Sequence, residues 1–177
     1  MKNYLVIGLI LFSIFSIQAQ DNNETLQQNY NEVKINGLYL VLGAIEGTFE
    51  KLLNEESGVG ISLFLPIDKD INDEINYYIS PYYRMYFGGK FAAGFFVEGF
   101  GLLSSVKESS FSIIEGDVLL GRDNVTDFAL GIGVGGKWVT NNGFIGELNL
   151  GVGRNLFNSN SIDDLVGKVA ITLGYRF

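Results

Sequence analysis

The sequence contains no cysteine and no histidine, and only 2 prolines in 177 residues. The absence of cysteine excludes disulfides, so stability has to come from backbone hydrogen bonds and packing. The absence of histidine excludes the Ser–His and Asp–His sites of hydrolases, because the base of such a site is a histidine. Three glutamates (Glu50, Glu98 and Glu147) offer carboxylates, but nothing in the sequence places them in an open cleft. We therefore expect no enzymatic activity and no cofactor.

Positive charge and long apolar runs are also scarce. Twelve Lys and Arg stand against twenty Asp and Glu, and the net charge of −8 argues against nucleic-acid binding. One long apolar run, Tyr4–Ile17, follows Lys2 and precedes Gln18-Ala19-Gln20. It is short for a membrane-spanning helix, which needs about 20 residues. Residues 1–19 therefore have the features of a cleaved signal peptide with the cut after Ala19.

The rest of the chain is rich in glycine and aromatic residues, with Gly 23, Phe 14 and Tyr 9. This composition favours many twisted strands and few helices. Residues 20–32 are polar and predict a flexible periplasmic lead-in, which leaves residues 33–177 as one domain. Within that domain we predict eight strands, at 33–43, 45–53, 58–66, 76–87, 91–105, 128–140, 144–155 and 165–177.

Period-two alternation is clearest in the last predicted strand, residues 165–177. Its odd positions are apolar or aromatic except for Gly167, and its even positions include Lys168 and Arg176. Such alternation is typical of a strand with two unlike faces. The strand ends on Gly174, Tyr175 and Phe177, an aromatic ending typical of the C-terminal assembly signal of outer-membrane barrels. If strands enter a membrane, they have to close into a barrel so that no edge amide is left unpaired.

In most predicted strands one face is bulky and apolar, and the other is small and polar with isolated charges. A narrow barrel has room inside for small residues and a few long polar ones, so we predict that the polar face lines the lumen and the apolar face meets lipid. Charges confined there need partners. We expect a salt-bridged plug, with an ion path as the alternative. The predicted lumen charges are Lys34, Glu46, Glu50, Arg84, Glu98, Lys137, Glu147, Lys168 and Arg176.

Short and long connections alternate, as expected for periplasmic turns and extracellular loops. The short ones are predicted at 54–57, 88–90 and 141–143, and the long ones at 67–75, 106–127 and 156–164. The turn at 141–143 places Lys137 opposite Glu147 and Trp138 opposite Gly146. An aromatic girdle is predicted at the short-turn end: Phe87, Phe91, Trp138, Phe144, Tyr175 and Phe177. The connection at 43–45 is very tight, and one unbroken strand over 33–53 is the alternative; an even strand number favours eight.

Two local motifs have competing interpretations. Residues 131–137 match GxGxxG and part of a P-loop, but Trp138 stands where Ser or Thr is required and no helix is predicted to follow. We interpret these glycines as thin lumen-facing residues. Asp68, Asp70, Asp73 and Glu74 form a candidate cation-binding loop, although the EF-hand pattern fails at two required positions. The alternative is an acidic loop in solvent, which also applies to Glu115, Asp117, Asp123, Asp127, Asp163 and Asp164.

The terminal Gly174-Tyr175-Arg176-Phe177 and the alternating connections resemble the small eight-stranded outer-membrane barrels, the family of outer membrane proteins A and X. The Gln18-Ala19-Gln20 signal end, Lys34-Ile35-Asn36 and Phe49-Glu50 also look like uncharacterised barrels of Bacteroidota. The resemblance covers the chain after the signal peptide. It implies an all-β, eight-stranded antiparallel up-and-down transmembrane β-barrel in the outer membrane, with both termini periplasmic and with the bilayer and the barrel assembly machinery as partners.

The sequence does not name an extracellular partner. The leading hypothesis is a closed, charge-filled barrel that serves as a structural or surface-interaction platform through acidic extracellular loops. The alternatives are a narrow ion channel through the polar lumen and a soluble periplasmic ligand-binding barrel.

Overall fold

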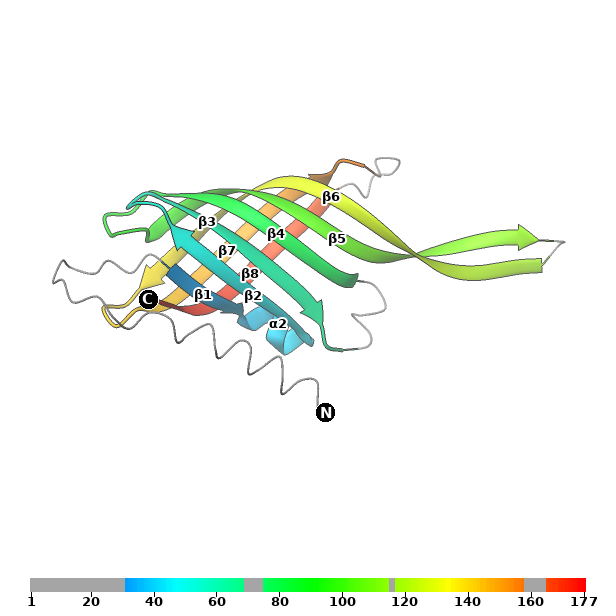
Figure 1. The fold of residues 1–177 in the computed structure, drawn as a ribbon, viewed down its shortest axis with the longest axis horizontal. Coiled ribbons are helices and arrows are strands. Elements are labelled where there is room, and N and C mark those ends of the chain that lie inside the picture. Colours follow the sequence, from blue (N-terminus) through cyan, green and yellow to red (C-terminus); the bar gives the residue numbers. More distant parts are fainter. Residues whose placement is uncertain (1–30, 69–74, 115–116, 158–164) are drawn as a thin grey trace, which may run out of the picture.

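The structure, a computed structural model, describes residues 31–68, 75–114, 117–157 and 165–177, with the backbone alone over 108–123. Eight antiparallel strands pair in sequence order, and β1 pairs with β8 to close the barrel (Figure 1). The strands are β1 (Asn31–Asn36), β2 (Ala44–Leu52), β3 (Ser57–Pro66), β4 (Ile75–Tyr86), β5 (Gly94–Ile114), β6 (Asp117–Val139), β7 (Phe144–Asn155) and β8 (Leu165–Arg176). The predicted all-β, eight-stranded up-and-down barrel is confirmed.

The barrel has two unlike rims. At the C-terminal rim the two ends of the sheet meet: the Asn31 amide donates to the Phe177 carbonyl (3.2 Å) and the Phe177 amide to the Asn31 carbonyl (2.9 Å). The three short connections, β2–β3, β4–β5 and β6–β7, lie at this rim. The opposite rim, which we call the hairpin rim, carries α2 (Gly37–Leu42) and the projecting β5–β6 hairpin (Figure 1). No helix in the described part of the chain is long and apolar enough to cross a bilayer.

The connection between the first two strands differs from the prediction. The strand expected over 33–43 ends at Asn36, and α2 follows; β1 also begins earlier than expected, at Asn31. The Asn36 side chain caps the helix by accepting from the Leu38 amide (3.1 Å), and Gly43 ends it with φ 93°, a left-handed conformation that suits glycine. A helical turn therefore replaces the tight turn, and the count of eight strands stands.

Asn36 also supports the seam where the barrel closes. The β1–β8 pairing ends at Asn36↔Thr172, so β8 continues past β1 toward the hairpin rim. There the Asn36 side-chain oxygen accepts from the Ile171 amide (3.2 Å), and its amide donates to the Val169 carbonyl (3.4 Å). One side chain thus takes over hydrogen bonds that a longer β1 would make.

The long loop predicted over 106–127 is instead largely a β-hairpin. β5 and β6 stay paired to Ile114↔Asp117, whereas the β4–β5 pairing ends at Val106 and the β6–β7 pairing at Ala129. The hairpin therefore projects beyond the barrel wall, as Figure 1 shows. Its polar composition predicts a loop, but the hydrogen-bond ladder between two adjacent strands continues without support from neighbouring strands.

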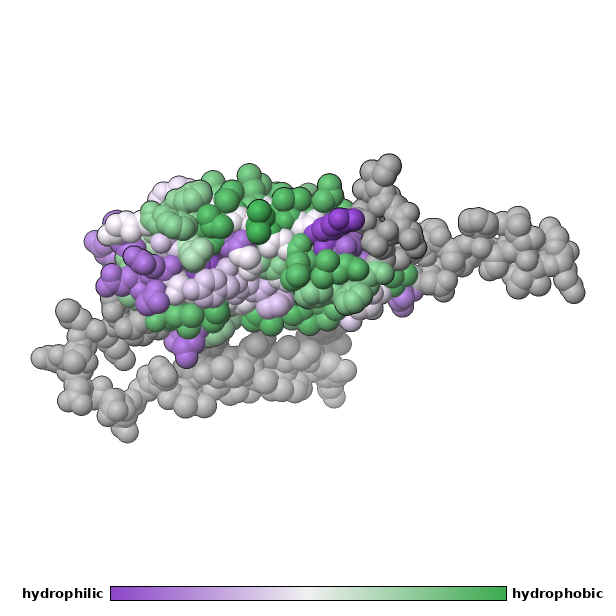
Figure 2. Space-filling model, turned by 90° about the horizontal axis from the view of Figure 1, so that it is seen from above, coloured by the Kyte–Doolittle hydropathy of each residue, from purple (hydrophilic) through white to green (hydrophobic). Residues whose placement is uncertain are grey.

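The strands turn their apolar face outward. Ile132 is 69% exposed and Leu150 60%, whereas Glu98 and Lys137 are each 1% exposed. Figure 2 shows hydrophobic residues over much of the barrel's visible face, with hydrophilic residues toward the C-terminal rim and in a smaller group near the hairpin rim. The predicted inside-out orientation of the faces agrees with these exposures.

The predicted register of β6 and β7 is confirmed, with Lys137↔Glu147 and Trp138↔Gly146. Of the aromatic girdle, all but Phe91 are substantially exposed near the C-terminal rim: Phe87, Trp138, Phe144, Tyr175 and Phe177. Phe91 does not belong to it. It lies in the β4–β5 turn and packs against a buried cluster of Leu52, Tyr86, Ala92 and Phe96.

Candidate functional site

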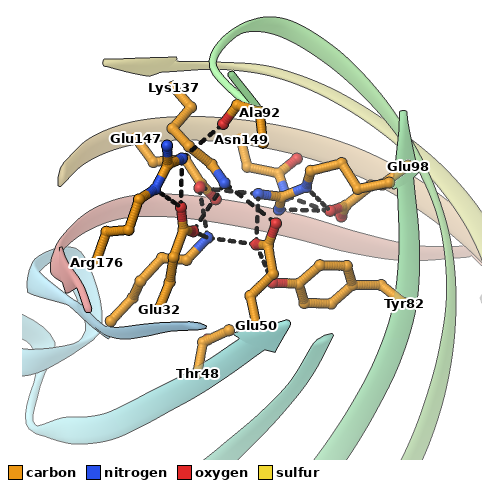
Figure 3. Close-up of polar contacts among 12 residues, drawn as sticks. Glu32, Thr48, Glu50, Tyr82, Ala92, Glu98, Lys137, Glu147, Asn149 and Arg176 are labelled. Atoms are coloured by element: carbon orange, nitrogen blue, oxygen red, sulfur yellow. Dashed lines mark hydrogen bonds and ion pairs between the residues drawn. The ribbon is translucent and has the colours of Figure 1, made fainter. Parts of the chain in front are cut away.

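The centre of the lumen is Glu50, whose side chain is completely buried on β2. Both of its carboxylate oxygens accept hydrogen bonds (Figure 3). Its donors are Lys34 (2.5 Å), Tyr82 (2.7 Å), Lys137 (3.1 Å), Arg84 (3.3 Å) and Tyr86. Three cations and two phenols from three other strands, β1, β4 and β6, meet at this carboxylate because the sheet closes on itself.

From Arg84 the network continues toward the hairpin rim. The guanidinium forks onto Glu98, through Nη2 (2.7 Å) and Nε (3.2 Å), and its Nη1 donates to Glu147 (2.8 Å). The other oxygen of Glu98 accepts from Lys168 and from the Asn149 amide, each at 2.8 Å. These charge-assisted bonds fix Arg84 in one position across the lumen.

From Lys34 the network continues toward the C-terminal rim. Lys34 bridges Glu50 to Glu147 (2.8 Å) and Glu32 (3.1 Å), and Lys137 reaches Glu32 at 2.8 Å. Arg176 completes the network by donating to Glu32 from Nη2 (2.6 Å) and Nε (2.9 Å). Glutamates and cations therefore alternate from Lys168 in one half of the lumen to Arg176 at its rim.

Arg176 also fastens the β4–β5 turn across the C-terminal mouth. Its guanidinium donates to the carbonyls of Phe91 (2.9 Å) and Ala92 (2.8 Å), and the Ala92 amide donates to the Glu55 carbonyl (2.7 Å). Ala92 is fully buried and has φ 41°, a conformation that non-glycine residues rarely adopt. These bonds and the buried cluster that contains Ala92 hold the turn inward. Phe91 therefore does not lie in the exposed aromatic girdle, where it was predicted.

Aromatic rings occupy much of the remaining lumen. The two rings from β5 were not predicted from the sequence. Phe96 and Phe100 share the inward face with Glu98 and are 0% and 3% exposed. The Arg84 guanidinium lies 3.8 Å from the Phe96 ring centre, and the Lys168 amine lies 4.9 Å from that of Phe100. Each ring thus fills space and meets a cation over its face. Phe96 and Phe100 lie two residues before and after Glu98, and this spacing could have predicted that both rings point into the lumen.

The inward glycines make room for these side chains. A Cβ on Gly60 would lie 2.3 Å from the Tyr82 ring, and one on Gly131 2.3 Å from the Phe100 ring. On Gly135 it would lie 2.3 Å from Phe96. The residues 131–137 form part of β6 with no following helix, so the glycine spacing reflects packing and not a phosphate loop. β3 adds no charge to the described network and provides Gly60 as space instead.

Eight of the nine predicted lumen charges join one network: Lys34, Glu50, Arg84, Glu98, Lys137, Glu147, Lys168 and Arg176. Glu46 stands apart. It is 3% exposed and accepts from the Asn36 amide (2.6 Å), and no ion pair reaches it among the described residues. Glu32, assigned to the lead-in from sequence, belongs to the network. Its alternation in phase with Lys34 was the signal that would have found it.

One small cavity lies within the network. A cavity of about 10 Å³, roughly the room of one water, remains between Lys34, Glu46, Thr48, Arg84, Asn149 and Lys168. The side-chain oxygen of Asn149 is buried without a hydrogen-bond partner within the described ranges. A single water donating to this oxygen fits the space.

The other predicted sites lie elsewhere. In the terminal motif, Tyr175 packs its ring edge-on against Phe144 on the outer face (5.6 Å), and a Cβ on Gly174 would lie 2.5 Å from the Val33 carbonyl. In the candidate cation loop, the Asp68 amide donates to the Gly43 carbonyl (2.8 Å), and Asp70, Asp73 and Glu74 lie outside the described residues. No cluster of three or more acidic side chains positioned for a metal occurs in the described ranges.

Of the other predicted loop acids, Asp127 is buried and accepts from the amides of Phe128 (2.7 Å) and Phe157 (3.4 Å). Asp117 and Asp123 lie on the hairpin strands, where only the backbone is described. Glu115, Asp163 and Asp164 lie outside the described residues. The acidic-loop interpretation is therefore wrong for Asp127, whose carboxylate is buried and accepts from two backbone amides.

Comparisons with known proteins agree with the architecture. No family model and no curated protein sequence matches this chain. Among solved structures, the chain is similar to the crystal structure of the N-terminal β-barrel domain of Pseudomonas aeruginosa OprF, with a TM-score of 0.55 and 16% identity. The similarity covers 85% of this chain and 98% of that domain. It shows that the fold is that of a small eight-stranded antiparallel β-barrel.

Proposed function

We propose that this protein is an outer-membrane barrel with a closed lumen that serves as a structural or surface-interaction platform. The observation that carries the proposal is the pairing of two unlike surfaces: an apolar exterior with exposed residues such as Ile132, and a lumen filled by ion pairs around Glu50. A water-soluble barrel would gain nothing from so much exposed hydrocarbon, whereas a lipid bilayer solvates it.

The same arrangement supports an anchoring role over transport or catalysis. The cavity of about 10 Å³ cannot hold a substrate, and the Arg84 side chain crosses the lumen with its nitrogens on three glutamates. Both oxygens of Glu50 and of Glu98 are engaged by donors, which leaves neither carboxylate free as an acid or base. The extracellular partner would then be met at the hairpin rim, where β5 and β6 project.

The same proposal includes the route to the membrane. A signal peptide over residues 1–19 would direct export, and the C-terminal rim would face the periplasm. Gly174, Tyr175 and Phe177 would be read by the barrel assembly machinery. The sequence features that support this route also support kinship with the uncharacterised barrels of Bacteroidota.

Planar-bilayer conductance of the purified protein tests the closed lumen. We expect no stable ion-sized current steps from the native protein. Regular steps that Lys137→Ala or Glu147→Ala abolishes would establish the ion-channel alternative. Heat-modifiable migration on a gel of detergent-extracted outer membrane tests the location, and release of the protein into the soluble periplasm without detergent would overturn it.

A further inference from the structure

The outer face of β7 ends in a cation. Leu148, Leu150 and Val152 point outward along this strand, and Arg154 follows them on the same face and is exposed. The register places Arg154 next to Leu130 of β6 and Leu165 of β8. Every other outward position of β7, which is described in full, is apolar or glycine. A single guanidinium thus stands at the end of a hydrocarbon surface.

The height of Arg154 on the barrel matches the thickness of a membrane. Arg154 comes ten residues after Phe144, which is exposed at the C-terminal rim. With about 3.3 Å per residue and a tilt of roughly 40°, ten residues climb about 25 Å, which is the height of the apolar band of membrane barrels. Phe144 and Arg154 therefore mark the two edges of one band, and Arg154 lies at the head-group level of the leaflet on the hairpin side.

A groove leads down from Arg154 into this band. It has a volume of about 410 Å³, and Leu130, Ile132, Val152 and Leu165 form its apolar walls. At the same rim Phe157 is 77% exposed, and its backbone amide is held by Asp127. The site therefore combines an apolar groove, an aromatic side chain at the boundary and one cation above the groove.

We propose that this groove binds a membrane lipid with an anionic, phosphate-bearing head group. The acyl chain lies against Leu130, Ile132 and Val152, and the phosphate accepts hydrogen bonds from Arg154. A guanidinium suits a phosphate because its N–H donors form a fork that matches two phosphate oxygens. It carries five such donors, so a lipid can share it with a protein partner. A second copy of the barrel would instead cover Arg154 with another apolar belt.

A second outward groove provides an internal comparison. It has a volume of about 580 Å³ and is lined by Val59, Pro81, Tyr83, Gly99 and Leu130, among others, but by no charged residue. It offers hydrocarbon contact without a site for a head group. We therefore expect this groove to accept acyl chains irrespective of their head group, and only the Arg154 groove to select an anionic lipid.

Native mass spectrometry of the full-length protein in detergent, titrated with phosphatidylglycerol or phosphatidylcholine of identical chains, tests the proposal. We expect the native protein to retain phosphatidylglycerol about fivefold better, the effect of about one interfacial cation, and Arg154→Gln to lose this preference. Lys51→Gln removes an exposed cation at the opposite rim and should leave the preference unchanged. Arg154→Lys, which keeps the charge but not the fork, should retain part of it.

The inference rests on membrane insertion, and the two fail in different ways. Heat-modifiable migration of each variant shows whether the barrel is folded. A folded native protein that retains both lipids equally would overturn the lipid site and leave the platform proposal intact. An equal loss of preference in Lys51→Gln and Arg154→Gln would also overturn the site, because it would reduce the effect to net charge. A protein released without detergent would contradict the membrane location itself.

Discussion

The two faces of the same strands follow different rules. Outward side chains such as Ile132 and Leu150 are exposed and contact neighbours only along the surface, so one apolar residue can replace another. Inward side chains such as Glu50 and Arg84 each have several named partners on other strands. The outer face of a strand therefore only has to be compatible with the medium around the barrel. The inner face has to match particular residues on other strands.

The largest effect is expected from breaking the inner face at its centre. Glu50→Gln leaves Lys34, Arg84 and Lys137 without their shared carboxylate in a buried site, at a cost of about 3–5 kcal/mol in the free energy of unfolding. Urea unfolding in lipid vesicles measures it. Glu55→Gln makes the same chemical change on an exposed turn residue and should leave the midpoint unchanged. Equal midpoints for both variants would contradict the proposed role of the network.

The next effect comes from placing a charge on the outer face. Val134 is 47% exposed on the apolar belt, four residues from Trp138 at the C-terminal rim. In a bilayer, Val134→Arg should lower the free energy of unfolding by about 2–4 kcal/mol, because a cation near the midplane loses its hydration. Val134→Leu is the control and should be nearly neutral in the same vesicles. A well-tolerated arginine would show that this face does not meet lipid.

A pair of glycines compares the two faces with one methyl group. Gly60→Ala places a Cβ 2.3 Å from the Tyr82 ring inside the barrel, and overpacking of this kind costs about 1–3 kcal/mol. Gly47→Ala makes the same change on the neighbouring strand, where nothing lies within 4 Å of the added carbon. We expect chemical denaturation to separate the two variants, with Gly47→Ala close to native. Similar losses would mean that strand propensity, not lumen packing, sets the cost.

The smallest effect concerns the aromatic edge of the outer face. The rings of Phe144 and Tyr175 meet edge to face at 5.6 Å between β7 and β8. Phe144→Leu keeps an apolar side chain but removes this contact, and should cost about 0.5–1.5 kcal/mol. A double-mutant cycle with Tyr175→Leu isolates the ring–ring contribution. A coupling energy indistinguishable from zero would assign both residues to lipid contact alone.

The face on which each strand residue lies could be predicted from sequence, because polar and apolar residues alternate along a strand whose two faces meet different surroundings. Lys137 and Trp138, adjacent in sequence, were assigned to opposite faces and lie there. The failures have local causes. Residues 37–42 are apolar, aromatic or glycine at every position, so they were read as a continuation of the strand before them. The helix depends on the Asn36 cap and the left-handed Gly43, which alternation does not reveal. The outer parts of β5 and β6 were predicted to be a loop because their composition is polar.

Within the lumen, the predictable part was which residues point inward, and the unpredictable part was which of them meet. Phe96 is apolar and was not assigned to a polar interior, yet it packs under Arg84. Glu46 shares the inward phase of Glu50 but lies nearer the hairpin rim, where Asn36 and not a cation contacts it. Height along the barrel axis depends on strand stagger, which sequence alternation alone does not specify.

The pair of Glu32 and Arg176 has a consequence for how the chain is made. These residues stand 144 positions apart and are directly opposite each other across the seam between β1 and β8. Until β8 joins the sheet, Lys168 and Arg176 are missing from the lumen. Glu98 and Glu32 then each lack one of their cations. Closure of the barrel before β8 has paired would therefore leave two buried glutamates each short of one cation, which makes it electrostatically unfavourable.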